Sequence, residues 1–123
     1  MNTHQQTAKE TIENLKKIQG ISKIILYGSV LKEQEKKDSD IDIAIVLDDI
    51  MKGTPLDMEG LPTNTHYKIQ QIKKKIEKQN KKKLHIVMYW ESEYEKGILL
   101  ESENKKPGKL CEEGKIVYDG YDN

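Results

Sequence analysis

The sequence has a single cysteine, no excess of charge of either sign and no long apolar run, and each lack excludes a class of protein. Cys111 has no second cysteine to pair with, which excludes a disulfide within the chain. Lys plus Arg and Asp plus Glu each number 21, so the net charge of zero gives no general attraction to nucleic acid or to an anionic membrane. No apolar segment is long enough for a signal peptide or a membrane span, and we therefore expect no membrane partner and a cytoplasmic location.

Length and composition predict a folded chain with a small core. Charged residues make up 34% and apolar residues 35% of the 123 residues, which indicates a limited core inside a very polar surface. The length is near the commonest domain size, so we expect one domain over residues 1–123.

Two short motifs carry the clearest chemical signal. An apolar run ends in the turn Gly28-Ser29, as expected where a buried strand passes into a helix or turn whose N–H groups can hold an anion. Asp40 and Asp42 then open a second apolar run. Alternate side chains of a strand share a face, so both carboxylates should lie on one face, opposite the apolar residues Ile41, Ile43, Ile45 and Leu47. Carboxylate oxygens suit Mg²⁺, which usually takes further ligands from the phosphates of a nucleotide.

The combined pattern is Gly28-Ser29, residues 30–39 and Asp40-Ile41-Asp42. It resembles the signature of the nucleotidyltransferase superfamily that includes DNA polymerase beta, in particular the minimal nucleotidyltransferases. Asp-x-Asp alone is common in solvated acidic loops, but the joint spacing, residue types and strand context are far more specific. The resemblance extends over most of the chain, and its specificity rests on residues 26–46.

The apolar patterns and this resemblance predict an α/β (α+β) fold, with a small mixed β-sheet and helices packed mainly on one face. Strands are predicted at residues 22–28, 41–47, 84–89 and 115–118. Helices are predicted at residues 5–19, just after Ser29, around Ile69, Ile72 and Ile76, from near Ser92 to about residue 101, and as one turn over residues 110–113. Residues 48–63 are rich in Gly and Pro, which predicts a poorly ordered loop.

The resemblance also implies roles for individual residues. Gly28 and Ser29 would contact the triphosphate of ATP, while Asp40 and Asp42 would bind Mg²⁺. An acceptor hydroxyl would attack the α-phosphate, and pyrophosphate would leave. The family usually places a third carboxylate on a later strand, and here that position is His85.

His85 leaves three interpretations open. Imidazole is a poor ligand for Mg²⁺, so the substitution predicts slow or lost catalysis. The ordinary pKa of histidine, about 6.5, also suits a general base at neutral pH. The third interpretation is a half-buried strand histidine with a hydrogen-bond partner. Glu91 or Glu93, just past the strand, would have to reach back to replace the missing acid. The other histidines, His4 and His66, are predicted to be structural or exposed.

Minimal nucleotidyltransferases commonly pair with a small helical protein of the HEPN class, as the antitoxin half of a toxin–antitoxin pair, and some transfer AMP to a tyrosine of that partner. The resemblance therefore implies an enzyme that transfers AMP from ATP to a partner protein. The alternative is a catalytically degenerate module that binds a nucleotide or its partner. A free-standing nucleic-acid binder is the least favoured interpretation, because acidic residues balance the lysine runs. The oligomeric state, including a homo-oligomer, stays open.

Overall fold

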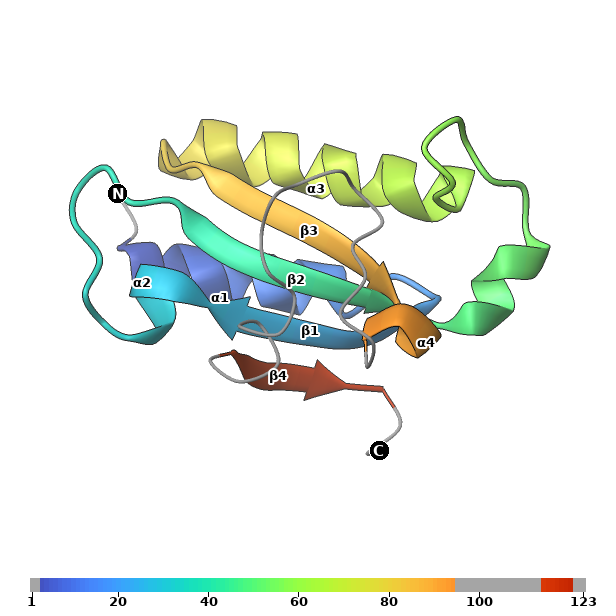
Figure 1. The fold of residues 1–123 in the computed structure, drawn as a ribbon. Coiled ribbons are helices and arrows are strands. Elements are labelled where there is room, and N and C mark those ends of the chain that lie inside the picture. Colours follow the sequence, from blue (N-terminus) through green and yellow to red (C-terminus); the bar gives the residue numbers. More distant parts are fainter. Residues whose placement is uncertain (1–2, 95–113, 121–123) are drawn as a thin grey trace.

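The computed structural model describes residues 3–94 and 114–120. Within these residues the chain forms four strands, four α-helices and one 3₁₀ helix (Figure 1). In chain order these are α1 (His4–Leu15), β1 (Ile21–Tyr27), α2 (Gly28–Leu31), β2 (Ile41–Leu47), η1 (Asp49–Gly53), α3 (Thr63–Asn80), β3 (Leu84–Trp90), α4 (Glu91–Tyr94) and β4 (Lys115–Asp119). The predicted turn at residues 110–113 and the predicted helix beyond residue 94 lie outside the described residues.

The four strands form one mixed sheet in the order β3-β2-β1-β4. β1 pairs antiparallel with both β2 and β4, whereas β2 and β3 run parallel. The parallel pair needs a crossover connection, and α3 supplies it. The predicted fold class, a small mixed sheet flanked by helices, is confirmed.

The two long helices, α1 and α3, lie on one face of the sheet (Figure 1). The side chains of Ile41, Ile43, Ile45 and Leu47 point to this face and belong to the main core cluster. Ala44 and Val46 point to the other face, where they pack with Ile25, Val87 and Tyr89. Asp42 falls in the same alternation as Ala44 and Val46, so its side chain lies on the face opposite the two helices. The strand thus separates the carboxylate from the main core, as the alternation predicts.

Helix α1 begins with a complete capping box. The side chain of Thr3 accepts the Gln6 N–H, and the side chain of Gln6 accepts the Thr3 N–H. The helix ends at Leu15, earlier than the predicted end at residue 19, and the chain turns at Gly20, whose φ is +98°. The Gly20 carbonyl accepts the Asp48 N–H at 2.8 Å, which ties this turn to the end of β2.

Residues 48–62 differ from the poorly ordered loop that their composition predicts. The segment holds η1 and a short bridge between Leu56 and Pro62. Asp48 Oδ1 accepts the Ile50 N–H at 3.0 Å, and Asp57 Oδ1 accepts the N–H groups of Glu59 and Leu61. Aspartate side chains therefore satisfy the backbone in place of a longer helix or strand.

Helix α3 has an apolar face and a lysine face. Ile69 and Ile76 are fully buried, and Ile72 is partly buried against the same core. Lys74, Lys75 and Lys78 are exposed and Lys73 is half-buried, so the opposite face is a solvated lysine face. No helix among the described residues is both long and apolar enough to cross a membrane.

Candidate functional site

The candidate site lies at the end of the sheet where β1 ends and β2 and β3 begin. Cα pairing places Tyr27 opposite Asp42 and Asp42 opposite His85, so the three residues form one row across the sheet. Paired residues point to the same face, and this row therefore lies on the face away from α1 and α3. The register brings together the Gly-Ser turn after Tyr27, one predicted metal ligand and the histidine at the third-carboxylate position.

Gly28 leaves the space in which the Asp42 carboxylate lies. Its φ is +77°, a left-handed conformation that favours glycine. A Cβ atom at this position would be 2.3 Å from Asp42 Oδ2, well inside van der Waals contact. Ser29 follows directly as the second residue of α2. The first N–H groups of a helix have no partner within the helix, so the turn presents donors beside the carboxylate.

Asp42 and His85 are in direct contact. His85 Nδ1 lies 3.2 Å from Asp42 Oδ1, and their side chains are 25% and 19% exposed. This arrangement agrees with a half-buried strand histidine that has a hydrogen-bond partner, and the partner is the predicted metal ligand itself. The role of His85 as a base, or as the mark of a lost acid, stays a prediction.

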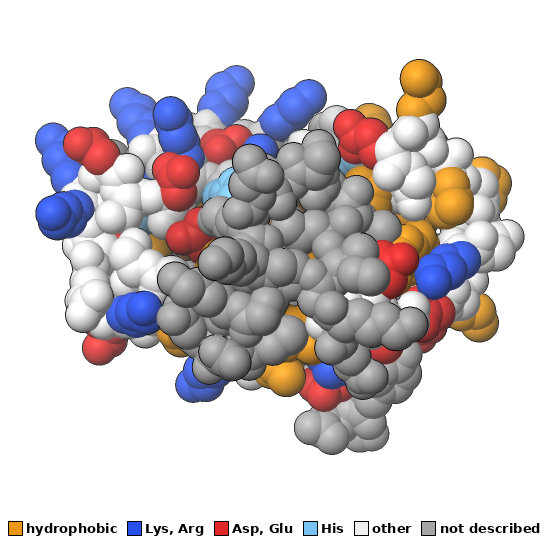
Figure 2. Space-filling view, viewed as in Figure 1, with side chains coloured by type: hydrophobic (Ala, Val, Ile, Leu, Met, Phe, Trp, Pro, Cys, Tyr) orange, Lys and Arg blue, Asp and Glu red, His pale blue; other side chains and the backbone are white. Residues whose placement is uncertain are grey.

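Asp40 lies two residues before Asp42, and its exposed side chain lines a groove of about 320 Å³. Most of the lining is basic or belongs to the turn before β2: His4, Lys37, Asp38, Ser39, Asp40, Lys81, Lys82 and Lys83. The Ile41 N–H donates to the Lys83 carbonyl at 2.9 Å, which holds the two segments together. Figure 2 shows Lys side chains gathered over the α2–β2 end of the molecule and along α3, with acidic side chains between them.

Sequence reasoning did not assign the lysines of this groove to the site. Lys81, Lys82 and Lys83 stand directly before the predicted strand at residues 84–89. Because β2 and β3 run parallel, their starting ends meet, and these lysines come to lie beside Asp40. The lysine run directly before an apolar strand could have been assigned to the site if the parallel pairing of β2 and β3 had been predicted.

Helix α1 holds the segment that carries Asp40. His4 is only 7% exposed, and its Nε2 lies 2.9 Å from the Ser39 carbonyl oxygen, one residue before Asp40. The Gln5 amide donates to the Val30 carbonyl at 2.6 Å, at the start of the same connection. His4 is therefore structural, which is one of the two predicted alternatives. Its contact with the Ser39 carbonyl positions the backbone directly before Asp40.

Glu91 does not replace the missing acid. Its two carboxylate oxygens accept from the Ser22 hydroxyl and pair with the Lys23 ammonium group, at the start of β1. Glu91 lies six positions after His85 along an extended strand, a distance of about 20 Å by strand geometry. Glu93 follows in α4 at the same distant end. β3 carries both glutamates away from Asp42, so neither lies where it could replace the third acid.

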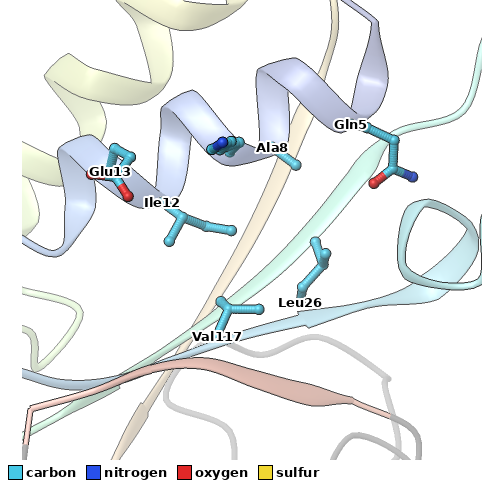
Figure 3. Close-up of a pocket in the computed structure, with 7 residues that line it drawn as sticks. Gln5, Ala8, Ile12, Glu13, Leu26 and Val117 are labelled. Atoms are coloured by element: carbon cyan, nitrogen blue, oxygen red, sulfur yellow. The ribbon is translucent and has the colours of Figure 1, made fainter.

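A second groove lies on the opposite face of the sheet. It has a volume of about 420 Å³ and lies between α1 and the strands β1 and β4, where Ile12, Leu26 and Val117 converge (Figure 3). Gln5, Ala8, Lys9 and Glu13 complete the lining. Its walls are mostly apolar, and it contains none of the residues that the two motifs predict.

The residues present fit Mg²⁺. Asp40 and Asp42 supply hard carboxylate oxygens, and the absence of a side chain at Gly28 leaves room for the Asp42 carboxylate itself. His85 supplies a nitrogen that Mg²⁺ does not favour, so oxygen donors from the bound phosphates would have to complete the coordination.

Comparisons with known proteins agree with this fold. The family model described as polymerase beta, nucleotidyltransferase matches residues 9–118. A candidate nucleotidyltransferase from Sulfolobus solfataricus has a similar fold, with a TM-score of 0.57 and 14% identity over 98% of this chain and 84% of that chain. A structure described as a toxin-antitoxin with AMP-PNP gives a TM-score of 0.54 and 15% identity, over 95% of this chain and 74% of that chain.

A comparison with curated proteins found no significant match. At 14% and 15% identity, the two structural likenesses show a shared fold alone. The family model, in contrast, spans most of the chain and includes both motifs. This protein belongs to the polymerase beta nucleotidyltransferase family.

Proposed function

We propose that this protein is a Mg²⁺-dependent nucleotidyltransferase that transfers AMP from ATP to a partner protein. The observation that carries the proposal is the contact between the Gly28 turn and the Asp42 carboxylate, with Ser29 directly after Gly28 and Asp40 two residues before Asp42. Family membership supports the reaction class, and the intact Gly-Ser and Asp-x-Asp elements support activity.

Different residues of the site would bind different parts of Mg²⁺-ATP. Asp40 and Asp42 would hold Mg²⁺, and Gly28 and Ser29 would face the phosphates. Lys81, Lys82 and Lys83, beside Asp40, add positive charge where an anionic triphosphate would otherwise meet two carboxylates. The bound metal would neutralise phosphate charge and lower the pKa of the attacking hydroxyl.

The proposed reaction exchanges one bond for another at the α-phosphorus of ATP. The acceptor oxygen forms a new bond to phosphorus, the bond to the bridging oxygen of pyrophosphate breaks, and the hydroxyl proton passes to a base. His85, whose Nδ1 contacts Asp42, lies beside the metal ligands and is the candidate for this base.

The proposed acceptor belongs to a small helical protein of the HEPN type, with this chain as the cytoplasmic antitoxin of the pair. The toxin-antitoxin structure with AMP-PNP has a similar fold, which supports this assignment. Mass spectrometry of a HEPN-type protein co-expressed with this chain tests it directly. Addition of one AMP to the partner is the expected result, and an unmodified partner in a stable complex would contradict the transfer.

Nucleotide binding is tested by calorimetry with ATP, with and without Mg²⁺. Asp42→Asn should weaken Mg²⁺-dependent binding at least about tenfold, because a metal ligand loses its charge. Asp38→Asn is the matched control, since Asp38 lines the same groove but stands outside the Asp-x-Asp motif. Equal affinities of the wild type and Asp42→Asn would remove the role proposed for the pair.

The contact between His85 and Asp42 also favours a second candidate function. A histidine at the position of the third acid would leave a module that binds a nucleotide or covers its partner without transferring AMP. Binding of Mg²⁺-ATP together with an unmodified partner would identify this module.

A further inference from the structure

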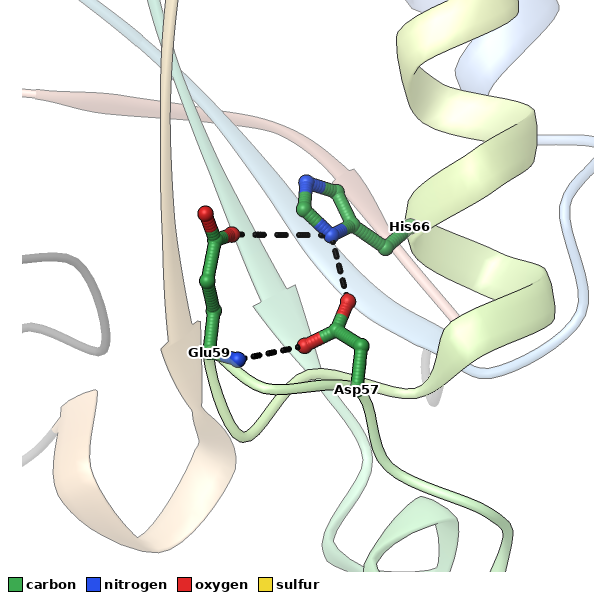
Figure 4. A group of neighbouring side chains, drawn as sticks. All are labelled: Asp57, Glu59 and His66. Atoms are coloured by element: carbon green, nitrogen blue, oxygen red, sulfur yellow. Dashed lines mark hydrogen bonds and ion pairs between the residues drawn. The ribbon is translucent and has the colours of Figure 1, made fainter.

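A second cluster of metal-ligating side chains lies at the opposite end of the sheet from Asp42. Asp57 and Glu59 belong to the connection after β2, and His66 lies in the first turns of α3 (Figure 4). This end of the molecule follows the last residues of β2, whereas the Asp-x-Asp motif precedes and opens that strand. The length of β2 therefore separates the two groups of residues by about 20 Å.

Three donor atoms converge in this cluster. His66 Nδ1 lies 2.7 Å from Asp57 Oδ2 and 3.8 Å from Glu59 Oε2, and all three atoms lie within 4.8 Å of one another. Zinc binds histidine nitrogen and carboxylate oxygen at about 2.0–2.2 Å, which places tetrahedral ligands roughly 3.3–3.5 Å apart. The two separations fall on either side of this range. A small rotation of the exposed Glu59 would shorten the longer separation, and His66 and Asp57 would move apart by roughly 0.6 Å as the metal replaces their hydrogen bond.

The backbone holds Asp57 ready for this role. Its Oδ1 accepts the N–H groups of Glu59 at 2.9 Å and Leu61 at 3.1 Å, so Oδ2 is directed at His66. The Asp57 N–H donates to the Leu61 carbonyl, and the Leu56–Pro62 bridge closes the turn. Burial opposes ionisation of Asp57, but the hydrogen bond from His66 and those from Leu61 and Glu59 outweigh it, and the pKa of Asp57 is lowered.

We propose that Asp57, Glu59 and His66 form a binding site for a divalent metal of the zinc type. A mixed set of one imidazole nitrogen and two carboxylate oxygens suits Zn²⁺ or Co²⁺, whereas Mg²⁺ prefers oxygen ligands alone. Three protein ligands leave a fourth position for water. A metal here would fasten the connection after β2 to the start of α3.

The hydrogen bonds of His66 show what metal binding would change. With Nδ1 donating to Asp57, Nε2 accepts from the Gln70 amide, at 3.2 Å. A metal at Nδ1 would bind the other neutral tautomer, so the single imidazole proton would move from Nδ1 to Nε2 with no net release. Nε2 would then carry the proton, and the Gln70 amide would turn to present its oxygen as an outer hydrogen-bond partner.

Glu59 distinguishes a metal site from a simple ion pair between His66 and Asp57. The hydrogen bond between His66 and Asp57 does not need Glu59, whose side chain is 63% exposed. A metal site does need it, because it supplies the third ligand. Glu59→Gln removes the charge of that ligand and leaves the contact between His66 and Asp57 in place.

The test is calorimetry with Zn²⁺ alone, followed by the visible absorption spectrum of the protein with Co²⁺. Glu59→Gln should weaken Zn²⁺ binding by at least the roughly 10–100-fold that loss of an outer partner costs, and His66→Gln should weaken it further. His85→Gln is the matched control: it removes the other histidine in contact with an aspartate, and the site at His66 should keep its affinity. Circular dichroism checks that each variant is folded.

Several results would overturn the proposal: no binding of Zn²⁺ by the wild type, or equal affinity of the wild type and Glu59→Gln. Loss of Zn²⁺ binding in His85→Gln but not in His66→Gln would instead place the metal beside Asp42. If His66→Gln does not fold, Glu59→Gln decides alone. Binding of Mg²⁺-ATP to Glu59→Gln should equal that of the wild type, so failure of the zinc site and failure of the proposed transferase function are distinguishable.

Discussion

The backbone of Gly28 and the carboxylate of Asp42 share a space that no other residue type at position 28 leaves open. The left-handed φ of Gly28 adds a second reason, because a side chain there costs about 1–2 kcal/mol in backbone strain. The turn and the metal ligand are therefore one structural unit, and a change at position 28 should alter both folding and nucleotide binding.

Gly28→Ala should lower the free energy of unfolding by about 1–2 kcal/mol and weaken binding of Mg²⁺-ATP at least about tenfold, because the new methyl group displaces the Asp42 carboxylate. Chemical denaturation and calorimetry measure the two effects. Gly53→Ala is the control, since nothing lies within 4 Å of a Cβ at Gly53. If both variants behave alike, the close approach to Asp42 has no importance for binding.

His85 decides between the active enzyme and the degenerate module. If a third acid is needed, His85→Asp should strengthen Mg²⁺ binding and raise AMP transfer, and His85→Ala should change the native activity little. If His85 is the base, His85→Ala should lower the rate by roughly 10²–10⁴. Mass spectrometry of the partner, co-expressed with each variant, separates these outcomes. Transfer at equal rates by all three proteins would exclude both roles.

Single-residue predictions succeeded where they depended on local spacing. The strand alternation placed Asp42 opposite the core residues, and the apolar run before Gly28 placed the turn at the end of β1. The partners of Glu91 and His66 were not predicted, because their contacts join segments far apart in the chain. Alternation along one strand carries no information about which distant side chain faces it.

At the scale of elements, Asp57 organises the connection between β2 and α3. Its carboxylate accepts two backbone N–H groups and contacts His66, so one side chain replaces several secondary-structure hydrogen bonds. The lowered pKa of Asp57 means that the folded state favours the ionised form. This contribution to stability is present above the pKa of an unfolded aspartate, about 3.9, and is lost as the pH falls through the lower pKa of the folded state.

Asp57→Ala should therefore lower the free energy of unfolding by about 1–3 kcal/mol at pH 7, and the difference from the wild type should shrink below about pH 4. Urea denaturation at both pH values, with a chelator present to remove metals, measures it. Asp38→Ala, a change at an exposed aspartate, is the control. A difference that stays constant down to pH 2 would show that the charge of Asp57 contributes nothing.

The helices and strands were predictable because the apolar residues in each recur with a clear period. The described strands differ from their predicted bounds by one residue or less at each end, and α3 contains the predicted isoleucine stripe. Residues 48–62 were not predictable in the same way, because Gly and Pro indicate where chain direction changes but not how the backbone is satisfied. Asp48 and Asp57 supply those hydrogen bonds.

At the scale of the whole molecule, the balance of charge limits the partners. Lys plus Arg equal Asp plus Glu, and the lysine groove beside Asp40 also contains Asp38. A local cluster of this kind can meet the phosphates of one nucleotide. An extended nucleic-acid surface needs an excess of positive charge along several phosphates, and the chain as a whole has none.

The protein without its partner should therefore bind duplex RNA or DNA more weakly than about 10⁻⁴ M at 150 mM salt, the weak end of non-specific binding. Fluorescence anisotropy with labelled duplexes measures this, and a repetition at 50 mM salt shows the size of the electrostatic contribution. A dissociation constant near 10⁻⁶ M with a steep salt dependence would contradict the prediction. In that case replacement of Lys81, Lys82 and Lys83 by Gln would show whether the groove is the contact, because each lost phosphate contact reduces the slope of log K against log salt by about one.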